Sequence, residues 1–410
     1  MSESIEVVRP ESVGLCSQRL ARIDSHLERR YIAPQKIAGA LTLVARKDQV
    51  AHLSTLGRMD IERDKPMRED TIFRIYSMTK PITSVAMMML YEHGHFQLDD
   101  PVHRLIPEWR NLGVYQLGNH PNWLTTPCQR PMTIRDLFCH TSGLTYDFMQ
   151  RTNLDRAYRR LQVGRDRQKD LRSMIETLAE LPLEFSPGTA WNYSLSTDVL
   201  GYLVELISGR SLDEYFRTEI FEPLGMVDTG FVVPPEKIER FAANYTRGRD
   251  KKPKLEDDPA TSAYTKPTTF FSGGGGLVST AADYLQFCRM LLRGGELDGH
   301  RLLGRKTIEL MTSNHLPTGR DLMDFATGAF SETTYAGVGF GLGFSVLLDP
   351  AKSQVVGSPG EFAWGGAAST AFWIDPSEEL IGLFLTQLMP SRTFNFRGQL
   401  KSIIYPAIID

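Results

Sequence analysis

The chain of 410 residues contains few cysteines, and they are scattered: Cys16, Cys128, Cys139 and Cys288 form no C-x-x-C pair. This spacing excludes a disulfide framework and favours reduced thiols. Long apolar runs are also missing, since none approaches the roughly 18 residues of a membrane-spanning helix. The charged start MSESIEVVRP lacks the apolar core of a secretion signal. We therefore expect a cytoplasmic protein that does not bind a membrane.

Charge of one sign is not in excess, because 46 Lys and Arg residues stand against 49 Asp and Glu residues, for a net charge of -3. This balance does not indicate a polyanion-binding surface, so a nucleic-acid partner is not expected. The nine histidines show no H-E-x-x-H or clustered spacing, and no metal site is predicted. Gly273 to Gly276 are not followed by the Gly-Lys-Ser/Thr of a phosphate loop, and no cofactor is predicted.

Strand-like segments lie at both ends of the chain, with helical segments between them. The stretch IAGALTLVARKDQVAHLSTLGRMD predicts two strands around a turn at Arg46, Lys47 and Asp48. Near the C-terminus, FGLGFSVLLD, STAFWID and ELIGLFLTQLM are short β-rich or apolar runs separated by turn residues, which is typical of an antiparallel meander. Residues 107–271 are predicted to form mostly helices and loops.

These segments predict an α+β fold, in which one antiparallel sheet is flanked by helices and a mainly helical lobe is inserted. The sheet lobe would comprise residues 1–106 and 272–410. The helical lobe, residues 107–271, would form the other wall of a cleft. The polar stretch RGRDKKPKLEDDPATSAYTKPTT is predicted to run over the surface.

The segment FRIYSMTKPITSVAMMML, residues 73–90, places Ser77 three positions before Lys80. Pro81 has no backbone N–H to donate, so a helix is predicted to begin near Ser77, and the two side chains then lie one turn apart on the same side. Apolar residues follow on nearly every face, which predicts a buried helix where a lysine is costly. The alternative is that Ser77 only caps the helix and Lys80 extends to solvent.

Two further motifs accompany this pair. Tyr193 precedes a predicted helix in WNYSLSTDVLGYLVELISG, and a double glycine, Gly365 and Gly366, lies at the predicted entry to a strand in FAWGGAAST. Together with Ser77-Met78-Thr79-Lys80, these motifs resemble in order and approximate spacing those of the serine β-lactamase superfamily, and most of all the family VIII carboxylesterases. The resemblance covers nearly the whole chain. It implies a β-lactamase/transpeptidase-like fold and a small-molecule ester as substrate.

A serine hydroxyl is a poor nucleophile until another group removes its proton during attack. The resemblance implies that Ser77 is the nucleophile and that Lys80 and Tyr193 share the proton path, with the division between them left open. It also implies an oxyanion hole formed by the backbone amides of Ser77 and Ala367. Glycines before Ala367 would let the backbone approach a substrate closely, although an ordinary turn or bulge also explains them.

The residues expected to contact substrate are Tyr76, Leu195, Trp364, Gly365 and Gly366, with Trp123 and Phe148 from the inserted lobe. In this resemblance, Leu195 replaces an asparagine of the β-lactamases and Trp364 replaces their lysine, which favours an acyl or aromatic ester over a β-lactam. His140, with Asp136 nearby, invites a Ser-His-Asp triad. No serine lies in G-x-S-x-G, however, so His140 is predicted to be structural.

The resemblance therefore implies a serine carboxylesterase that hydrolyses short-chain carboxylic esters through an acyl-enzyme at Ser77, with weak cephalosporin hydrolysis. Three alternatives stay open: a β-lactamase or D-aminopeptidase-like amidase, an acyltransferase that passes the acyl group to an alcohol, and an inactive penicillin-binding-like module. The intact Ser77, Lys80 and Tyr193 argue against the inactive module. The oligomeric state is not indicated.

Overall fold

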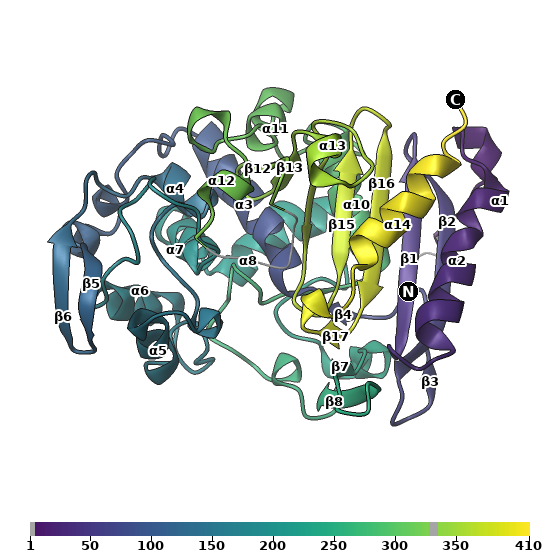
Figure 1. Cartoon of the computed structure of the whole chain (residues 1–410), viewed down its shortest axis with the longest axis horizontal. Coiled ribbons are helices and arrows are strands. Elements are labelled where there is room, and N and C mark those ends of the chain that lie inside the picture. Colours follow the sequence, from purple (N-terminus) through teal and green to yellow (C-terminus); the bar gives the residue numbers. More distant parts are fainter. Residues whose placement is uncertain (1–4, 328–334) are drawn as a thin grey trace.

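An eight-stranded antiparallel sheet forms the centre of the molecule (Figure 1). The computed structural model describes residues 5–327 and 335–410. In spatial order the strands are β12 (Val338–Phe340), β13 (Ser345–Leu347), β14 (Phe362–Gly365), β15 (Ala371–Asp375), β16 (Leu380–Thr386), β1 (Gly39–Arg46), β2 (Gln49–Asp60) and β3 (Lys65–Pro66). The two ends of the chain meet where β1 pairs with β16, from Ala40 opposite Thr386 to Arg46 opposite Leu380. The predicted α+β fold is confirmed.

Each face of this sheet packs against its own set of helices. Along β1, Ala40 and Val44 belong to a core with α1 (Ser17–Leu20), α2 (Arg22–Leu27) and α14 (Phe396–Ile404). Leu41 and Leu43, on the opposite face, belong to a second core with α3 (Thr79–Glu92) and α10 (Ala281–Leu292). Side chains alternate between faces with a period of two, so a strand covered on both sides reads as one continuous apolar run.

The N-terminal hairpin is confirmed, with a turn one residue shorter than predicted. Arg46 is the last residue of β1 and pairs with Gln49. Lys47 and Asp48 alone form the turn, and both have positive φ angles, 49° and 65°. Two-residue turns of this kind match the twist of the strands they join.

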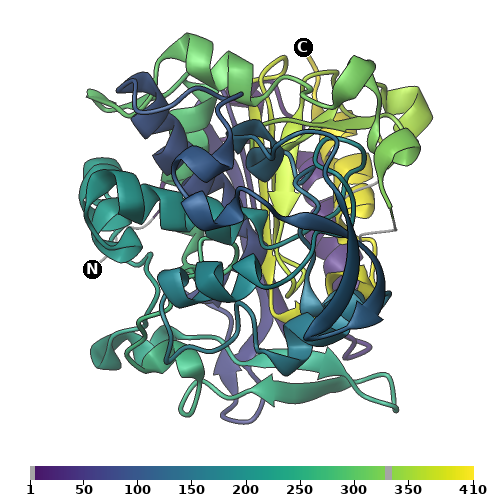
Figure 2. The same cartoon turned by 90° about the vertical axis from the view of Figure 1, so that its left-hand side faces the viewer.

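The inserted region is mainly helical but also contains two hairpins that were not predicted. Its helices are α4 (Ile134–Phe138), α5 (Asn153–Arg160), α6 (Leu171–Ala179), α7 (Ser196–Ser208), α8 (Leu212–Phe216) and α9 (Glu222–Leu224). Figure 2 shows this region in front of the sheet. The first hairpin, β5 (Gly113–Asn119) and β6 (Asn122–Pro127), projects at the left of Figure 1. Its strands are exposed or half-buried throughout, so they lack the apolar alternation that marks a strand in sequence.

The second hairpin, β7 (Asn244–Arg247) and β8 (Pro253–Asp257), lies in the polar stretch that was predicted to run over the surface. Strand β7 pairs in parallel with β17 (Leu388–Met389). This pairing places residues 244–257, which the sequence assigned to the helical lobe, beside the C-terminal strands. The division into two lobes stays a prediction.

Short elements complete the described chain. They are β4 (Phe73–Arg74), which pairs with β9 (Val278–Ser279), the hairpin β10 (Glu296–Leu297) and β11 (His300–Arg301), and the helices α11 (Arg305–Met311), α12 (Leu322–Phe325) and α13 (Pro350–Ser353). The β4–β9 pair matters for function, because it brings the segment before Ser77 beside the glycine-rich segment 273–276.

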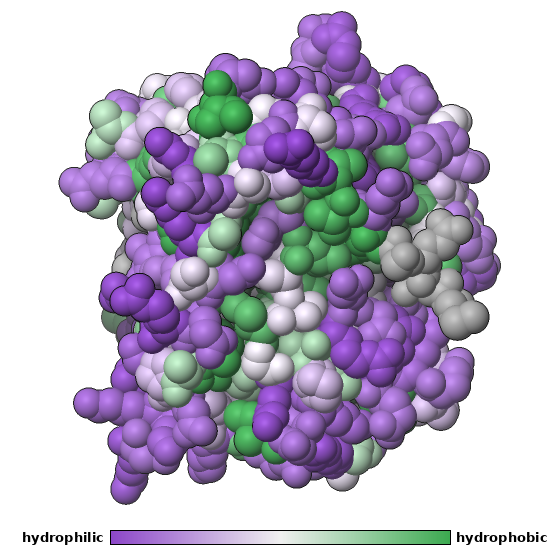
Figure 3. All heavy atoms as spheres, turned by 90° about the vertical axis from the view of Figure 1, so that its right-hand side faces the viewer, coloured by the Kyte–Doolittle hydropathy of each residue, from purple (hydrophilic) through white to green (hydrophobic). Residues whose placement is uncertain are grey.

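The side of the molecule that carries α1 and α2 is mainly hydrophilic, with hydrophobic side chains in smaller areas near its centre (Figure 3). These helices bury their apolar residues, among them Ile23 and Leu27, against the sheet and leave their polar residues outside. Among the described residues, no helix is both long enough and apolar enough to cross a bilayer.

Candidate active site

Ser77 lies at the entrance to the buried helix α3. A 3-10 turn, Tyr76–Met78, leads directly into Thr79, and every residue from Thr79 to Leu90 is buried, as the sequence predicted. Tyr76 has a φ of 42°, a left-handed conformation that is costly for a tyrosine and that is maintained at functional sites by surrounding contacts. One such contact is the hydrogen bond that Asn244 Nδ2 donates to the Tyr76 hydroxyl at 3.1 Å.

Three predicted residues meet at the hydroxyl of Ser77. Lys80 Nζ lies 3.2 Å from Ser77 Oγ, and the Tyr193 hydroxyl lies 2.6 Å from it. Lys80 also donates to the carbonyl oxygen of Gly274 at 2.5 Å. Ser77, Lys80 and Tyr193 are 9%, 2% and 1% exposed. The alternative in which Lys80 extends to solvent is therefore wrong, and Ser77 has two partners able to move its proton.

Aromatic rings enclose this group. The ammonium of Lys80 lies 4.5 Å from the ring centroid of Tyr193 and 5.4 Å from that of Tyr146. On the other side of Tyr193 lie the rings of His140 at 4.8 Å and Trp364 at 5.6 Å. Ring faces stabilise a nearby cation, and their exclusion of water strengthens every electrostatic interaction inside. Trp364 is 1% exposed and packs against Tyr193, and its expected contact with an acyl or aromatic ester stays a prediction.

The double glycine lies where β14 ends, not at the entry to a strand as the sequence suggested. Gly365 is the last residue of β14, and residues 366–370 form the turn into β15. A Cβ on Gly366 would lie 2.4 Å from the carbonyl oxygen of Ile75, two residues before Ser77. Only glycine therefore lets this turn approach the start of α3.

Two backbone amides near the Ser77 hydroxyl have no hydrogen-bond acceptor among the described residues. Among the residues that the structure describes, no acceptor is found for the amide of Ala367 in the β14–β15 turn or for that of Ser77. An unsatisfied N–H in the first turn of a helix is a ready donor to an anion. These are the amides predicted to form the oxyanion hole, and that role stays a prediction.

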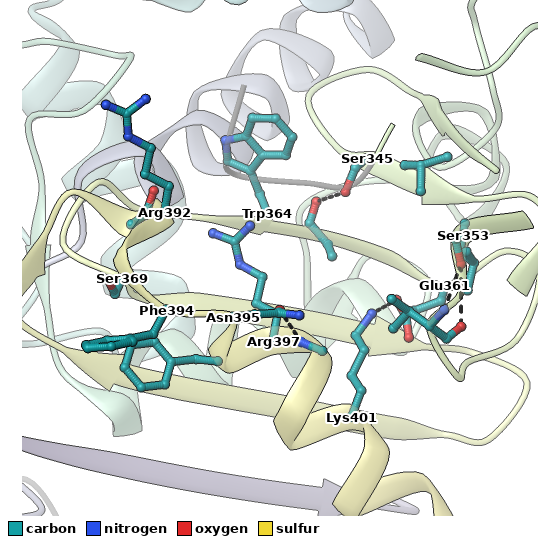
Figure 4. A pocket seen from close by; sticks show the side chains of 17 residues that line it. Ser345, Ser353, Glu361, Trp364, Ser369, Arg392, Phe394, Asn395, Arg397 and Lys401 are labelled. Atoms are coloured by element: carbon teal, nitrogen blue, oxygen red, sulfur yellow. Dashed lines mark hydrogen bonds and ion pairs between the residues drawn. The ribbon is translucent and has the colours of Figure 1, made fainter. Parts of the chain in front are cut away.

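A cavity of about 310 Å³ lies beside the end of β14, between this strand and α14 (Figure 4). Arg397 of α14 and the nearby Arg392 extend toward its Trp364 end, whereas Lys401 extends to Glu361. A Cβ on Gly365 would lie 2.1 Å from Nη2 of Arg397. A guanidinium therefore lies against the third motif, close to the position at which the lysine of the β-lactamases is replaced by Trp364.

The remaining predicted contact residues lie in different surroundings. Phe148 is 45% exposed and stacks on Tyr146 at 4.6 Å, and its contact with a substrate stays a prediction. Leu195 is buried, and its side chain packs against Gly164. Trp123 lies in the β5–β6 hairpin, where its ring contacts are with Tyr115 and His120. Its placement in an acyl pocket stays a prediction.

His140 is structural in this arrangement, as predicted. Its Nδ1 lies 3.3 Å from Ser194 Oγ, and burial, together with the charge of Lys80, lowers the pKa of His140 well below its ordinary value. Asp136 is engaged elsewhere, because its carboxylate accepts hydrogen bonds from Arg130 and Thr141. The described residues also contain no group of three or more His, Cys, Asp and Glu side chains that could hold a metal ion.

Sequence reasoning missed two residues of this cluster, Tyr146 and Asp198. Tyr146 lies in the loop between α4 and α5 and carries no recognisable spacing. Asp198 lies in the first turn of α7, where an acidic residue is ordinary because it complements the helix dipole. Its burial and its position opposite Gly274 mark it as unusual, and neither property can be read from the sequence.

Comparison with known proteins places the chain in a family. The beta-lactamase family model matches residues 25–402. Protein Rv1367c of Mycobacterium tuberculosis is 38% identical over 357 residues, 86% of each chain. Esterase EstB of Burkholderia gladioli is 32% identical over 387 residues, which cover 89% of this chain and 90% of the esterase. The solved structure of EstCE1, a hydrolase with promiscuous acyltransferase activity, matches with a TM-score of 0.78 at 28% identity and covers 95% of this chain and 99% of EstCE1.

Proposed function

The chain belongs to the beta-lactamase family, and we propose that it is a serine carboxylesterase that hydrolyses short-chain esters through an acyl-enzyme at Ser77. The observation that carries this proposal is the position of Ser77 Oγ, 2.6 Å from the Tyr193 hydroxyl and 3.2 Å from Lys80 Nζ, at the start of a buried helix. The similarity to esterase EstB and to the hydrolase EstCE1 supports an ester as the substrate.

In the proposed first step, Ser77 Oγ attacks the ester carbonyl carbon while Tyr193 accepts its proton. The carbonyl oxygen becomes an oxyanion that accepts hydrogen bonds from the amides of Ser77 and Ala367. When the intermediate collapses, the carbon–oxygen bond to the alcohol breaks and the proton passes to the departing alkoxide. Water then attacks the acyl carbon and gives a proton to Tyr193. The bond between this carbon and Ser77 Oγ breaks, Tyr193 returns the proton to Ser77 Oγ, and the acid leaves.

Tyr193 is proposed as the base because the surroundings of Lys80 favour a cation. The Lys80 ammonium donates to the Gly274 carbonyl and lies over two ring faces, and a neutral amine would lose most of this stabilisation. A fixed positive charge 4.5 Å from the Tyr193 ring in turn favours a phenolate there. Lys80 then acts by charge and orientation, and Tyr193 moves the proton.

Weak cephalosporin hydrolysis is proposed as a side activity, because Arg397 places a cation beside Gly365 that can attract a substrate carboxylate. Measuring p-nitrophenyl butyrate and a chromogenic cephalosporin with one preparation tests it. Ester turnover should exceed cephalosporin turnover. The reverse order would favour a β-lactamase or amidase. A rise in acyl-transfer product on addition of an alcohol, at the expense of free acid, would favour an acyltransferase.

The proposed mechanism is tested by reacting the protein with a p-nitrophenyl phosphonate and locating the adduct by intact-mass and peptide-mass spectrometry. We expect one adduct, on Ser77, and none in Ser77→Ala. Ser84→Ala is the matched control, since Ser84 is also a buried serine of α3 and its hydroxyl has no partner among the described residues. An adduct on another serine, or full ester hydrolysis by Ser77→Ala, would overturn the assignment.

A further inference from the structure

A buried carboxylate lies behind the Lys80 site and has no part in the proposed chemical steps. Asp198 is the third residue of α7 and is 1% exposed. Its side chain does not cap α7. It extends instead to the segment after residue 271, where it accepts a hydrogen bond from the Ser272 hydroxyl at 2.5 Å and from the Gly274 amide at 3.0 Å.

The residue that Asp198 binds is also the one that holds Lys80. Gly274 donates its N–H to Asp198 and accepts the Lys80 ammonium at its carbonyl oxygen, at 2.5 Å. A Cβ on Gly274 would lie 2.3 Å from Oδ2 of Asp198, so a side chain at this position would displace the carboxylate. A continuous chain of contacts therefore runs from Asp198 through Gly274 and Lys80 to Ser77.

The neighbouring glycine is confined in the same way. The hydroxyl of Thr83, on α3, donates to the carbonyl oxygen of Gly273 at 2.7 Å, and a Cβ on Gly273 would lie 2.9 Å from the carbonyl oxygen of Thr197, on α7. The two glycines are thus clamped between the helix that carries Lys80 and the helix that follows Tyr193. The position of the Gly274 carbonyl depends on this packing and on Asp198.

Asp198 also acts on the cluster through its charge. Burial raises the pKa of Asp198 above its ordinary value, and the positive charge of Lys80 opposes that rise, so the two groups interact. Besides Lys80, the titratable groups close to this interaction are Tyr193, Tyr146 and His140. Among the described residues, Lys80 is the positively charged group that counteracts the rise in the pKa of Asp198.

We propose that Asp198 is a positioning residue: its carboxylate fixes the amide of Gly274, and with it the residue whose carbonyl oxygen holds the Lys80 ammonium against Ser77, and its negative charge keeps Lys80 cationic. This inference rests on the proposed function, in which Lys80 and Tyr193 serve Ser77. In this inference, residues 272–274 hold Lys80 in position. Neither a phosphate loop nor a simple turn has that role.

Two substitutions separate the effect of the Asp198 hydrogen bonds from the effect of its negative charge. Asp198→Asn keeps an oxygen that can accept both hydrogen bonds but removes the charge. We expect kcat to fall about 10-fold, with KM little changed. Both limbs of the kcat/KM pH profile should move to lower pH, because removing an anion disfavours the Lys80 cation and favours a Tyr193 phenolate. Asp198→Ala also releases the Gly274 peptide, and kcat should fall about 100-fold.

The chain offers a closely matched control in Asp283. It too is the third residue of an apolar helix, α10, is 2% exposed, and accepts hydrogen bonds from a hydroxyl, that of Thr229, and from a backbone amide, that of Asp228. Asp283→Asn should therefore cost similar stability in thermal unfolding but leave kcat and the pH profile unchanged.

The outcomes distinguish the inference from the function on which it rests. Loss of kcat and a shifted pH profile in Asp198→Asn, but not in Asp283→Asn, would support the positioning role. Unchanged kcat and pH profile in Asp198→Asn, with Ser77→Ala and Lys80→Met inactive, would overturn that role alone. If Ser77→Ala keeps wild-type ester hydrolysis, the proposed function itself fails.

Discussion

Two buried lysines lie on opposite sides of the central sheet, and their partners differ. Lys401, on α14, forms an ion pair with Glu361, and the Tyr405 hydroxyl contacts Glu361 and Asp375. Lys80, on α3, donates instead to two uncharged oxygens, those of Ser77 and Gly274. A lysine paired directly with a carboxylate is electrostatically satisfied. A lysine that also donates to a serine hydroxyl has its charge beside a group that can react.

Replacement of Lys401 and replacement of Lys80 should therefore have different consequences. Removing one partner of a buried ion pair leaves the other charge unpaired, which costs stability. Removing a lysine that serves a nucleophile costs rate. The pair Lys80→Met and Lys401→Met tests this contrast with one chemical change, since methionine retains most of the apolar volume of lysine.

The largest effect is expected from Lys80→Met. Its kcat/KM for a p-nitrophenyl ester should fall about 1000-fold, because the proton path of Ser77 loses its charged partner. Stopped-flow or steady-state absorbance measures the rate, and thermal unfolding checks the fold. Activity within tenfold of wild type would remove Lys80 from the mechanism and break the contrast with Lys401.

Lys401→Met should reduce the free energy of unfolding by about 3 kcal/mol, because Glu361 is left buried without its cation. The kcat of the protein that remains folded should be unchanged, since Lys401 contacts Glu361 and the ring of Trp373, on the side of the sheet opposite to α3. Urea denaturation measures the first quantity and active-site titration with the phosphonate normalises the second. A loss of kcat without a loss of stability would contradict this assignment.

Gly366→Ala tests the close approach between the β14–β15 turn and the start of α3. Its Cβ would lie 2.4 Å from the Ile75 carbonyl oxygen, so the turn must move and take the Ala367 amide with it. We expect kcat to fall about 100-fold, the cost of one oxyanion-hole donor. Gly230→Ala is the control, since its Cβ would meet no atom closer than 3.9 Å. Equal activity of the two variants would exclude the Ala367 amide.

The smallest effect concerns Glu184, which accepts hydrogen bonds from Asn192, the neighbour of Tyr193, and pairs with Arg151. Burial raises the pKa of Glu184 from 4.5 to about 7, more than Arg151 lowers it. The folded protein thus holds this proton more tightly than the unfolded chain, and the resulting stability is present below pH 4.5 and lost as the pH rises through about 7.

Glu184→Gln should therefore flatten the pH dependence of stability. Between pH 4.5 and pH 8 we expect the wild type to lose about 2 kcal/mol more than the variant, measured by urea denaturation at each pH. An equal loss in both proteins would show that Glu184 does not titrate in this range. Asp283, whose pKa burial raises to about 6, is present in both proteins and cancels in the difference.

Whether a feature of this protein could be predicted from the sequence depends on how far apart in the chain its interacting residues lie. The contact between Ser77 and Lys80 was predictable because side chains three positions apart at the start of a helix lie on the same side, and Pro81 marked where that helix begins. The hairpin of β1 and β2 was predictable because a short turn joins two apolar runs. The β5–β6 hairpin was missed because its half-exposed strands have no apolar alternation.

The sequence by itself determined the α+β class, the start of α3 and the identity of Lys80 and Tyr193 as the two groups at the Ser77 hydroxyl, since turn chemistry, helical spacing and motif order are local or nearly local. Only the tertiary structure decided that Asp198 binds the Gly274 peptide, that Gly366 lies against Ile75, and that Arg397 lies against Gly365. Each of these contacts joins segments that local preferences do not relate. They form because the helices and strands that carry them pack to bury their apolar faces.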